Sequence, residues 1–230
     1  MAGERARRRV AELWWSRVPP DGQVFTRLLE LLDPAERQRA GRFRTLDAGW
    51  RFIAARAMLR QLLGQRLGAA PVGVPLSTQP GGKPELAAGP ATLHFNISHS
   101  GHVAAVGLAA APVGVDVEVD RPMPRAQRIA DRFFAPSERR WLAARPVAER
   151  ARAFLGLWTC KEAYVKAVGG RLGPSLSRIE VDPEVPAILR PPDARRWSLL
   201  RAELPVGALC AVAVPGEGWS LEVTEFEWEL

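Results

Sequence analysis

The sequence predicts an α+β protein made of two lobes of similar size. Two kinds of segment alternate along it: longer stretches whose apolar residues recur with helical spacing, and short apolar or alternating runs bounded by turn residues. The order strand, helices, strands occurs twice, and the two halves meet near residue 111. We therefore expect an N-terminal α/β lobe over residues 1–111 and a C-terminal α/β lobe over residues 112–230.

The first half begins with a predicted strand and continues with three predicted helices. The run from Pro19 to Gly22 ends the strand, and Asp33 followed by Pro34 is typical of a helix N-cap with proline in the first turn. Between residues 47 and 67, apolar side chains recur with helical spacing and arginines lie between them. We expect a strand over 10–18, helices over 23–32, 34–42 and 47–67, and a Gly- and Pro-rich loop over 68–90.

The second set of elements spans the midpoint and the rest of the chain. Short apolar runs separated by Ser-Gly and Ala-Pro turns predict strands on both sides of the midpoint. Pro136 begins one of the helices that follow, and Gly169 with Gly170 ends the longest one. We expect strands over 93–98, 102–109 and 113–119, helices over 128–134, 136–144 and 147–168, and further strands within 197–230.

Composition narrows the class of protein. Hydrophobic residues make up 47% and charged residues 25%, the balance of a globular protein. The longest apolar candidate, 103–115, is shorter than the roughly 18 residues of a membrane helix, and Glu12 and Arg17 interrupt what a signal peptide would keep apolar. Two cysteines are too few for a disulfide framework or a Cys-rich zinc site. We expect a cytoplasmic protein with no membrane partner.

The charge pattern favours an anionic partner. The formal net charge is +7, and only three of the 32 basic residues are lysines: Lys83, Lys161 and Lys166. Where arginine supplies nearly all positive charge, a lysine suggests a phosphate contact or a proton transfer, which a compact ammonium group suits. All three histidines lie between residues 94 and 102.

Residues 114–119, GVDVEV, place two acids on one face of a predicted strand. Asp116 and Glu118 alternate with valines, so their carboxylates point the same way, roughly 7 Å apart. A divalent cation such as Mg²⁺, shared with substrate phosphates, would offset their repulsion. The competing interpretation is an exposed edge strand with two solvated acids.

Residues 154–169, FLGLWTCKEAYVKAVG, place three functional side chains on one face of a predicted helix. Trp158, Glu162 and Lys166 are spaced four residues apart. A surface Glu-Lys pair is the simpler interpretation, worth about 0.3–0.5 kcal/mol. If Glu162 instead faces the acids of the strand, three carboxylates converge on one metal ion and Lys166 reaches the same phosphates.

Two further segments suit phosphate binding. HFNISHSG, residues 94–101, offers hydroxyls and imidazoles near a turn, but Ser98 and His99 point to opposite faces of a strand and so do not form a nucleophile-base pair with each other. GGKP, residues 81–84, presents Lys83 on a loop and lacks the spacing of the GxxxxGK(S/T) phosphate loop. Each segment alone is also compatible with a polar turn.

Taken together and in this order, the segments resemble the 4′-phosphopantetheinyl transferase superfamily, specifically its larger, monomeric, surfactin-type group. The resemblance rests on GKP at 82–84, FNISHSG at 95–101, GVDVE at 114–118 and WTCKEAYVK at 158–166. It covers residues 33–170 well, whereas the tail beyond 170 matches only in length and strand-like character.

The resemblance implies a pseudo-dimer of two α/β lobes with coenzyme A in the cleft between them. It implies the activity of a 4′-phosphopantetheinyl transferase, or holo-acyl-carrier-protein synthase: the 4′-phosphopantetheine arm moves to a serine of an acyl or peptidyl carrier protein, and adenosine 3′,5′-bisphosphate leaves. Mg²⁺, or Mn²⁺, would be the cofactor and a monomer the acting form.

The family's site residues carry over by motif. The resemblance assigns the metal to Asp116, Glu118 and Glu162. Glu162 is also the expected base for the serine proton, and Lys166 binds the phosphates and is the candidate acid for the leaving group. Ser98 and His99 would contact the phosphates, with Lys83, Arg51 and, more weakly supported, Arg39 near the adenine and 3′-phosphate.

The chain departs from the family at position 36, where Glu36 replaces a basic residue often found near the 3′-phosphate. Either Arg37 or Arg39 takes over that contact, or it is lost. Lys161 lies within the helical motif but points about 100° away from Glu162, and its role stays open.

Two other functions are compatible with parts of the sequence. A metal-dependent nuclease also uses separated acids, but its last acid and lysine usually lie two apart on a strand, whereas Glu162 and Lys166 lie four apart on a predicted helix. A nucleic-acid-binding module would set aromatic residues on a basic strand platform, and here they are scattered. We expect no nucleic-acid partner. The identity of the carrier proteins and the tolerance for acylated coenzyme A stay open.

Overall fold

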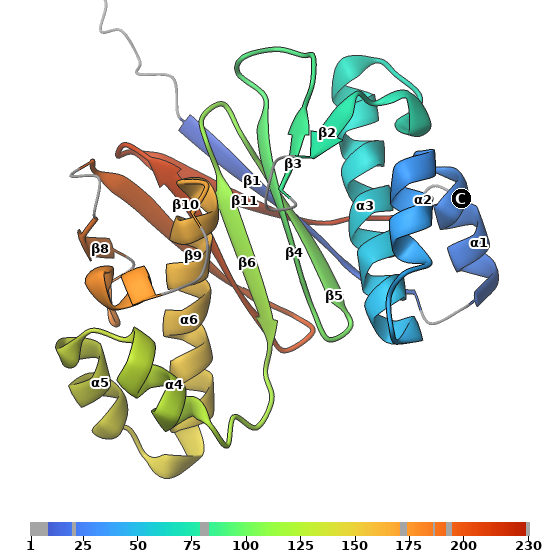
Figure 1. Ribbon diagram of the computed structural model, residues 1–230. Helices are drawn as coiled ribbons and strands as arrows, with labels where there is room; N and C mark the ends of the chain where they lie inside the picture. The colour runs from blue at the N-terminus through green and yellow to red at the C-terminus, as the bar shows by residue number, and fades with distance from the viewer. Residues whose placement is uncertain are drawn as a thin grey trace, which may run out of the picture.

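The computed structural model describes residues 9–19, 22–78, 83–170, 174–185, 187–191 and 195–228 (Figure 1). The α-helices are α1 (Gly22–Glu30), α2 (Pro34–Ala40), α3 (Leu46–Leu67), α4 (Ala126–Phe133), α5 (Pro136–Ala143) and α6 (Arg150–Ala167). The strands are β1 (Arg9–Arg17), β2 (Leu76–Thr78), β3 (Pro84–Leu86), β4 (His94–Ser100), β5 (Val103–Ala109), β6 (Gly114–Val119), β7 (Glu180–Asp182), β8 (Ala187–Arg190), β9 (Trp197–Leu204), β10 (Ala208–Pro215) and β11 (Trp219–Glu225). The mixed α+β class is confirmed.

Most predicted elements are present, with several differences. The expected loop over 68–90 contains a 3₁₀ turn (Pro71–Gly73) and a hairpin of β2 and β3. The last long helix begins at Arg150 because Val147–Glu149 forms a separate 3₁₀ turn. The short pair β7 and β8 follows it and was not predicted. A 3₁₀ helix over Pro174–Arg178 before β7 was not predicted either. The missed elements are three to five residues long, too short to show a hydrophobic period.

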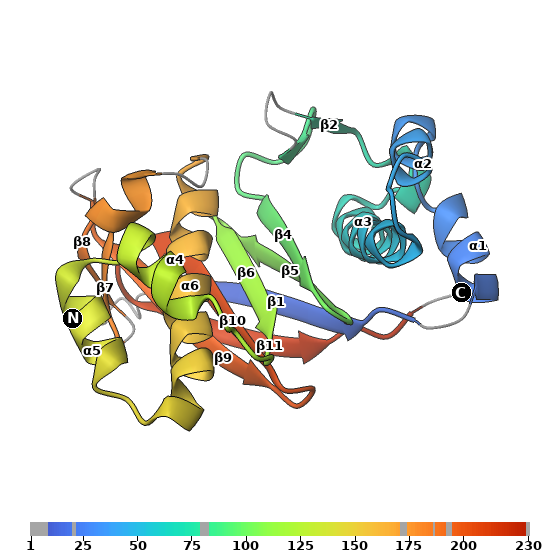
Figure 2. The ribbon, with the colours of Figure 1, turned by 60° about the horizontal axis from the view of Figure 1, so that its bottom comes forward.

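Two sheets form the centre of the molecule. The first has the strand order β11-β1-β5-β4 and the second β6-β10-β9. Apolar side chains of the two sheets pack against each other, including Leu13 and Val103 from the first sheet and Val115 and Val212 from the second. The outer face of the first sheet packs against α3, and that of the second against α6 (Figure 2). The result is four layers, helix, sheet, sheet and helix.

The last strand, β11, belongs to the sheet whose other strands come from the first half of the chain. Strand β11 pairs in parallel with β1, with Val10 opposite Ser220, so a segment near the C-terminus completes the first sheet. Sheet membership therefore does not follow a single boundary near residue 111, and the division into lobes at 1–111 and 112–230 stays a prediction.

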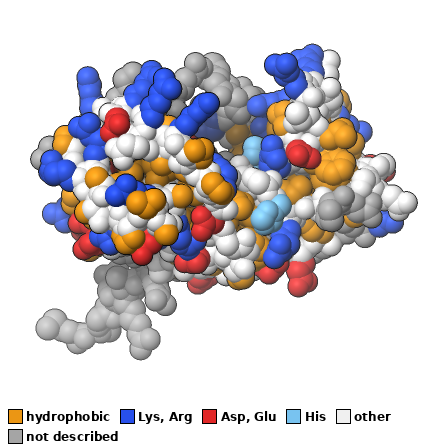
Figure 3. All heavy atoms as spheres, turned by 90° about the horizontal axis from the view of Figure 1, so that it is seen from below, with side chains coloured by type: hydrophobic (Ala, Val, Ile, Leu, Met, Phe, Trp, Pro, Cys, Tyr) orange, Lys and Arg blue, Asp and Glu red, His pale blue; other side chains and the backbone are white. Residues whose placement is uncertain are grey.

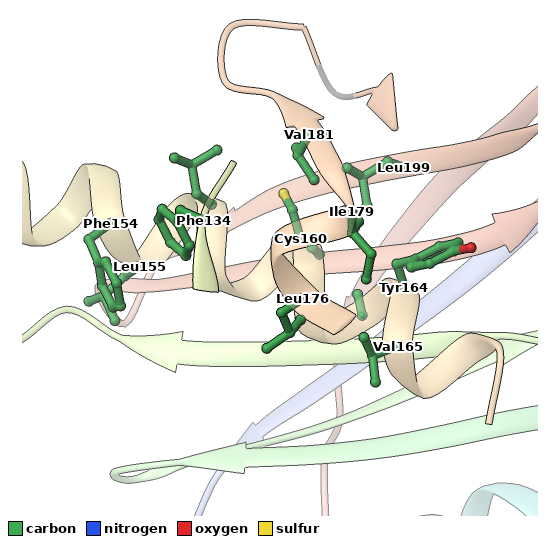
Figure 4. Packing of buried hydrophobic residues seen from close by; sticks show 14 of the residues in the cluster. Phe134, Phe154, Leu155, Cys160, Tyr164, Val165, Leu176, Ile179, Val181 and Leu199 are labelled. Atoms are coloured by element: carbon green, nitrogen blue, oxygen red, sulfur yellow. The ribbon is translucent and has the colours of Figure 1, made fainter. Parts of the chain in front are cut away.

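Helix α6 is held in place by a buried core on the outer face of the second sheet. Figure 4 shows this packing, in which α6 side chains meet residues from α4, the segment after α6, and strands β7 and β9. The labelled residues are Phe134, Phe154, Leu155, Cys160, Tyr164, Val165, Leu176, Ile179, Val181 and Leu199. This packing fixes which side of α6 faces β6, and with it the direction of Glu162 and Lys166.

Strand β6 lies close enough to α6 to require glycine at one position. A Cβ on Gly114 would collide with the carbonyl oxygen of Ala163 and the amide nitrogen of Ala167, and would lie 3.0 Å from the Cα of Ala167. The backbones of the strand and the helix are therefore in contact, which brings the acids of β6 near Glu162 of α6.

Local sequence signals explain several helix ends. Asp33 caps α2, accepting a hydrogen bond from the amide of Glu36 while the Glu36 carboxylate accepts one from the Asp33 amide, a capping box. Gly68 ends α3 in the left-handed conformation, with φ of 64°. Within the described ranges, no helix combines the length and apolar character needed to cross a bilayer.

Candidate active site

A cavity of about 420 Å³ lies between the two halves of the molecule. Its walls come from α2 and α3, the segment leading into β3, strands β4 and β6, and the C-terminal end of α6. Eight residues predicted for the site line it together: Arg39, Lys83, Ser98, His99, Asp116, Glu118, Glu162 and Lys166. Gly81 and Gly82 of the GGKP segment lie outside the described residues.

One wall of the cavity is acidic, with a single lysine in contact with it. Asp116 is 4% exposed, and its Oδ1 accepts hydrogen bonds from Lys166 Nζ at 2.7 Å and Ser98 Oγ at 2.8 Å. Glu118 Oε2 accepts from Arg121 Nη1 at 2.6 Å. The carboxylates of β6 thus face the cavity, and the alternative of an exposed edge strand with solvated acids is wrong for Asp116.

Glu162 from α6 interacts electrostatically with both acids of β6. Desolvation by burial, followed by the charge of Asp116, raises the pKa of Glu162 to about 7, while Lys166 opposes the shift. Burial likewise raises the pKa of Asp116 despite Lys166 and Ser98. Three carboxylates from a strand and a distant helix therefore share one poorly solvated wall.

This wall fits a divalent cation in its chemistry. Asp116 Oδ2 is buried and has no hydrogen-bond partner among the described residues, which is costly unless something else binds it. The described part of the chain contains no group of three His, Cys, Asp or Glu side chains already gathered as metal ligands. Lys166 and Arg121 instead bind the carboxylates of Asp116 and Glu118. Hard oxygen donors with an unpaired buried oxygen are the donor set that Mg²⁺ prefers.

The basic wall of the cavity contains an arginine that the sequence did not single out. Arg56 from α3 lines the cavity beside Arg39, and both guanidinium groups lie over the ring of Phe52, at 5.5 and 5.0 Å from its centroid. Arg56 is buried, and its Nε has no hydrogen-bond partner in the part of the chain described. The cavity therefore has an acidic wall and a basic wall that face the same space. On the face of the molecule shown in Figure 3, histidine side chains lie beside Lys and Arg side chains.

Comparisons with known proteins identify the family of this chain. The family model of the 4′-phosphopantetheinyl transferase superfamily matches residues 112–212, and that of the 4′-phosphopantetheinyl transferase N-terminal region matches residues 15–113. The 4′-phosphopantetheinyl transferase HetI of Nostoc sp. is 37% identical over 215 residues, which cover 90% of this chain and 88% of that protein. The chain belongs to the 4′-phosphopantetheinyl transferase superfamily.

Other relatives place this phosphopantetheinyl transferase in the larger group of the superfamily. The 4′-phosphopantetheinyl transferase Sfp of Bacillus subtilis is 30% identical over 155 residues, 67% of this chain and 68% of that protein. Among solved structures, the holo-acyl-carrier-protein synthase (AcpS) of Thermotoga maritima is 25% identical over 46% of this chain and 62% of that chain, with a TM-score of 0.34.

Glu36, the residue that departs from the family pattern, has a structural role in this transferase. It is buried, and its carboxylate forms ion pairs with Arg60 at 2.5 Å and with Arg56 at 3.2 Å. Arg60 is 0% exposed and also pairs with Asp33. Glu36 thus holds Arg56 in the cavity wall, so this chain keeps a basic group there although position 36 is acidic.

Two other arginines predicted from the sequence lie away from the centre of the site. Arg37 donates hydrogen bonds to the carbonyl oxygens of Leu32 and Glu30 and so is engaged with the helix before it. Arg51 is not among the described residues that line the cavity. The charge of Arg51 still affects His99. Desolvation by burial, followed by the positive charges of Arg51 and Lys166, lowers the pKa of His99 and favours its neutral imidazole.

Lys83 connects the two halves of the transferase across the cleft. Its Nζ donates a hydrogen bond of 2.9 Å to the carbonyl oxygen of Lys166 at the C-terminal end of α6. Burial lowers the pKa of Lys83. A cation at this end of a helix is stabilised by the helix dipole, so Lys83 supports the last turn of α6 as well as lining the cavity.

Lys161, whose role the sequence left open, is structural. It is 0% exposed, pairs with Glu138 of α5 at 2.8 Å, and donates hydrogen bonds to the carbonyl oxygens of Leu176 and Ile179. It therefore ties α6 to α5 and to the segment after α6. The scarcity of lysines pointed toward chemistry for all three, and for Lys161 that inference is wrong because its partners lie on the side of α6 away from the cavity.

The raised pKa of Glu162 predicts an unusual dependence of stability on pH. Below about pH 4.5 the carboxyl is protonated in both the folded and unfolded states, whereas between pH 4.5 and about 7 only the unfolded state ionises. Ionisation of Glu162 thus costs stability as the pH rises. We expect Glu162→Gln, without metal, to be more stable than the wild type at pH 8 by roughly 1–3 kcal/mol, with the difference vanishing near pH 4.

Chemical denaturation at pH 4, 6 and 8 in EDTA measures this difference. Glu222→Gln, on the exposed part of β11, is the matched control and should show no such trend. An equal stability of Glu162→Gln and the wild type at pH 8 would show that Glu162 is not held in a repulsive, desolvated environment.

Proposed function

We propose that this enzyme transfers the 4′-phosphopantetheine arm of coenzyme A to a serine hydroxyl of an acyl or peptidyl carrier protein. The reaction releases adenosine 3′,5′-bisphosphate and depends on Mg²⁺, with Mn²⁺ as a substitute. The observation that carries this proposal is the cavity in which Asp116, Glu118 and Glu162 face Arg39, Arg56 and His99. The relatives named above supply the activity, and the two walls supply a place for a charged, phosphate-rich substrate.

The acidic wall is the proposed metal site. Asp116, Glu118 and Glu162 would hold Mg²⁺, which supplies charge neutralisation at the pyrophosphate when bound. Lys166 lies beside Asp116 with its side chain 28% exposed, so it can turn from the carboxylate toward a phosphate oxygen. Its positive charge would then stabilise the negative charge that develops as the bridging oxygen leaves.

Glu162 is the proposed base that accepts the proton of the acceptor serine. The serine oxygen forms a bond to the phosphorus of the pantetheine phosphate, and the bond from that phosphorus to the bridging oxygen breaks. Glu162 would accept the serine proton because its carboxylate lines the cavity beside Asp116 and Glu118, where the pyrophosphate is proposed to lie. Lys166 is the candidate donor of a proton to the departing phosphate.

The basic wall is proposed to bind the nucleotide end of coenzyme A. His99, Arg39 and Arg56 line this side of the cavity and can approach the 3′-phosphate. Arg56 is held in this wall by its ion pair with Glu36 and would contribute positive charge beside the phosphate. Lys83 lies nearer to α6, on the side proposed for the adenine. Ser98 contacts Asp116 and Lys166 on the acidic wall and is proposed to contact the phosphates together with His99.

The proposed architecture is a pseudo-dimer of two α/β lobes with coenzyme A between them. The position of the cavity between α3 and β4 on one side and β6 and α6 on the other supports it. We expect the enzyme to act as a monomer in the cytoplasm, without nucleic acid or membrane as partner.

The decisive experiment is the mass of a carrier protein after incubation with the enzyme. An apo carrier protein with coenzyme A and Mg²⁺ should gain the mass of one phosphopantetheinyl group. The gain should disappear in EDTA, return with Mg²⁺ or Mn²⁺, and be absent when the acceptor serine of the carrier is alanine. Transfer that persists in EDTA would contradict the metal site, and no mass gain on acyl or peptidyl carriers of any type would contradict the proposed activity.

A further inference from the structure

Strands β4 and β6 are joined by side chains rather than by a backbone ladder. The backbone amides of Val115, Val117 and Val119 donate hydrogen bonds to side-chain oxygens of β4 at 3.1, 3.4 and 3.3 Å. The acceptors are, in the same order, Asn96 Oδ1, Ser98 Oγ and Ser100 Oγ. Side-chain oxygens of alternate β4 residues thus act as the acceptors that backbone carbonyl oxygens would be in a sheet. They join the edges of the two sheets in parallel register.

Two of these three side chains also hold an acid of the site. Ser98 Oγ donates to Asp116 Oδ1 at 2.8 Å, and Ser100 Oγ donates to Glu118 Oε2 at 2.5 Å. A serine hydroxyl has one proton and two acceptor positions. Each serine oxygen accepts a hydrogen bond from the amide of the valine that follows the acid, so its own proton is free to be donated to the carboxylate. The bond from the amide also fixes the position of the hydroxyl and hence the direction of this donation.

Glu118 has a second partner, Arg121, which is more exposed to solvent. Arg121 binds Glu118 Oε2 at 2.6 Å, but the Arg121 side chain is 43% exposed, whereas that of Glu118 is 15% exposed. Arg121 Nη1 also donates to the Val119 carbonyl oxygen at 3.1 Å and to Ser100 Oγ at 3.3 Å, but its contacts are solvent-exposed, and exposed ion pairs contribute little. Ser100, anchored to the backbone of β6, is the rigid partner.

We propose that Ser100 is a positioning residue that aims the Glu118 carboxylate at the divalent-cation site. This inference rests on the proposed function, since it concerns the metal site of that reaction. Ser100 is not among the described residues that line the cavity, so it would act through Glu118 rather than on the substrate. Partners of metal ligands commonly change metal affinity by 10-fold or more when removed.

The test measures metal binding without turnover. Calorimetric titration of Mg²⁺ into enzyme saturated with coenzyme A, with no carrier protein present, gives the dissociation constant of the metal. We expect Ser100→Ala to weaken Mg²⁺ binding about 10-fold, and Ser100→Thr, which keeps the hydroxyl, to restore most of it. The affinity for coenzyme A in EDTA should be the same in all three proteins, a pattern that a general loss of structure would not produce.

Controls separate the possible outcomes. Ser220→Ala removes a hydroxyl that donates to the carbonyl oxygen of Arg9 on β1, remote from the cavity, and should bind Mg²⁺ like the wild type. If Ser100→Ala unfolds, Ser100→Cys, whose thiol is a weak donor, takes its place. Wild-type affinity for Mg²⁺ in a folded Ser100→Ala or Ser100→Cys would overturn the positioning role alone. A wild type that binds coenzyme A but no Mg²⁺ would overturn the metal site of the proposed function as well.

Discussion

Asp116→Ala is expected to lower the rate of phosphopantetheine transfer about 1,000-fold, a loss of about 4 kcal/mol of transition-state stabilisation. The carboxylate is the most buried of the three acids, contacts both Ser98 and Lys166, and has an oxygen without a hydrogen-bond partner in the described structure. Removing it takes away a proposed metal ligand and the group that holds Lys166. Initial rates on an apo carrier protein, followed by mass spectrometry, measure the loss.

Asp116→Asn distinguishes a functional loss from a structural one. Burial raises the pKa of Asp116, so its ionised form is an electrostatic cost to the folded protein. The asparagine variant should therefore be inactive while its melting temperature equals or exceeds that of the wild type without metal. Glu222→Ala, an exposed acid on β11, should keep full activity. A near-normal transfer rate in Asp116→Asn would exclude Asp116 as a ligand that needs its charge.

Gly114→Ala is expected to destabilise the fold by more than about 3 kcal/mol, or to prevent folding. Its Cβ would meet backbone atoms of Ala163 and Ala167, and neither can yield as a flexible side chain would. Helix α6 would have to move away from β6, taking Glu162 and Lys166 with it. Activity should therefore be lost together with stability. Denaturant unfolding compared with the wild type measures the change.

Gly73→Ala is the matched control for this substitution. A Cβ at Gly73 has no atom within 4 Å, and its backbone does not adopt a positive φ. This variant should unfold within about 0.5 kcal/mol of the wild type. If Gly114→Ala were as stable and as active as Gly73→Ala, the close approach of β6 to α6 would be wrong, and with it the basis for the convergence of the three acids.

Much of the fold and the site could be predicted from local patterns. Helical spacing, the Asp33-Pro34 cap and the terminal glycines located the helices because each signal depends only on neighbours within a few residues. The acids at 116 and 118 were assigned to one strand face, and Glu162 and Lys166 to one helix face, for the same reason. Both pairs of side chains line the cavity, as expected if each pair shares one face. Their metal and catalytic roles stay predictions.

Ion pairs between residues far apart in the chain could not be predicted from the sequence. Lys161 and Lys166 share one helix and similar neighbours, yet Lys161 pairs with Glu138 in the core while Lys166 contacts Asp116 in the cavity. The sequence predicts that Glu36 leaves the 3′-phosphate contact to Arg37 or Arg39, or that the contact is lost, whereas in the structure Glu36 pairs with Arg56. The position of Arg56 between apolar residues on α3 was the only available signal, and it was equally compatible with an exposed face.

The chain's local spacing thus specified which side chains share a face and which family the motifs resemble. Packing between distant segments determined which of those faces turn toward the same cavity. It also determined that β11 completes the first sheet and that serines of β4 bind the acids of β6. The physical reason is that periodicity arises from bonds between near neighbours, whereas desolvation and ion pairing depend on groups that only folding brings together.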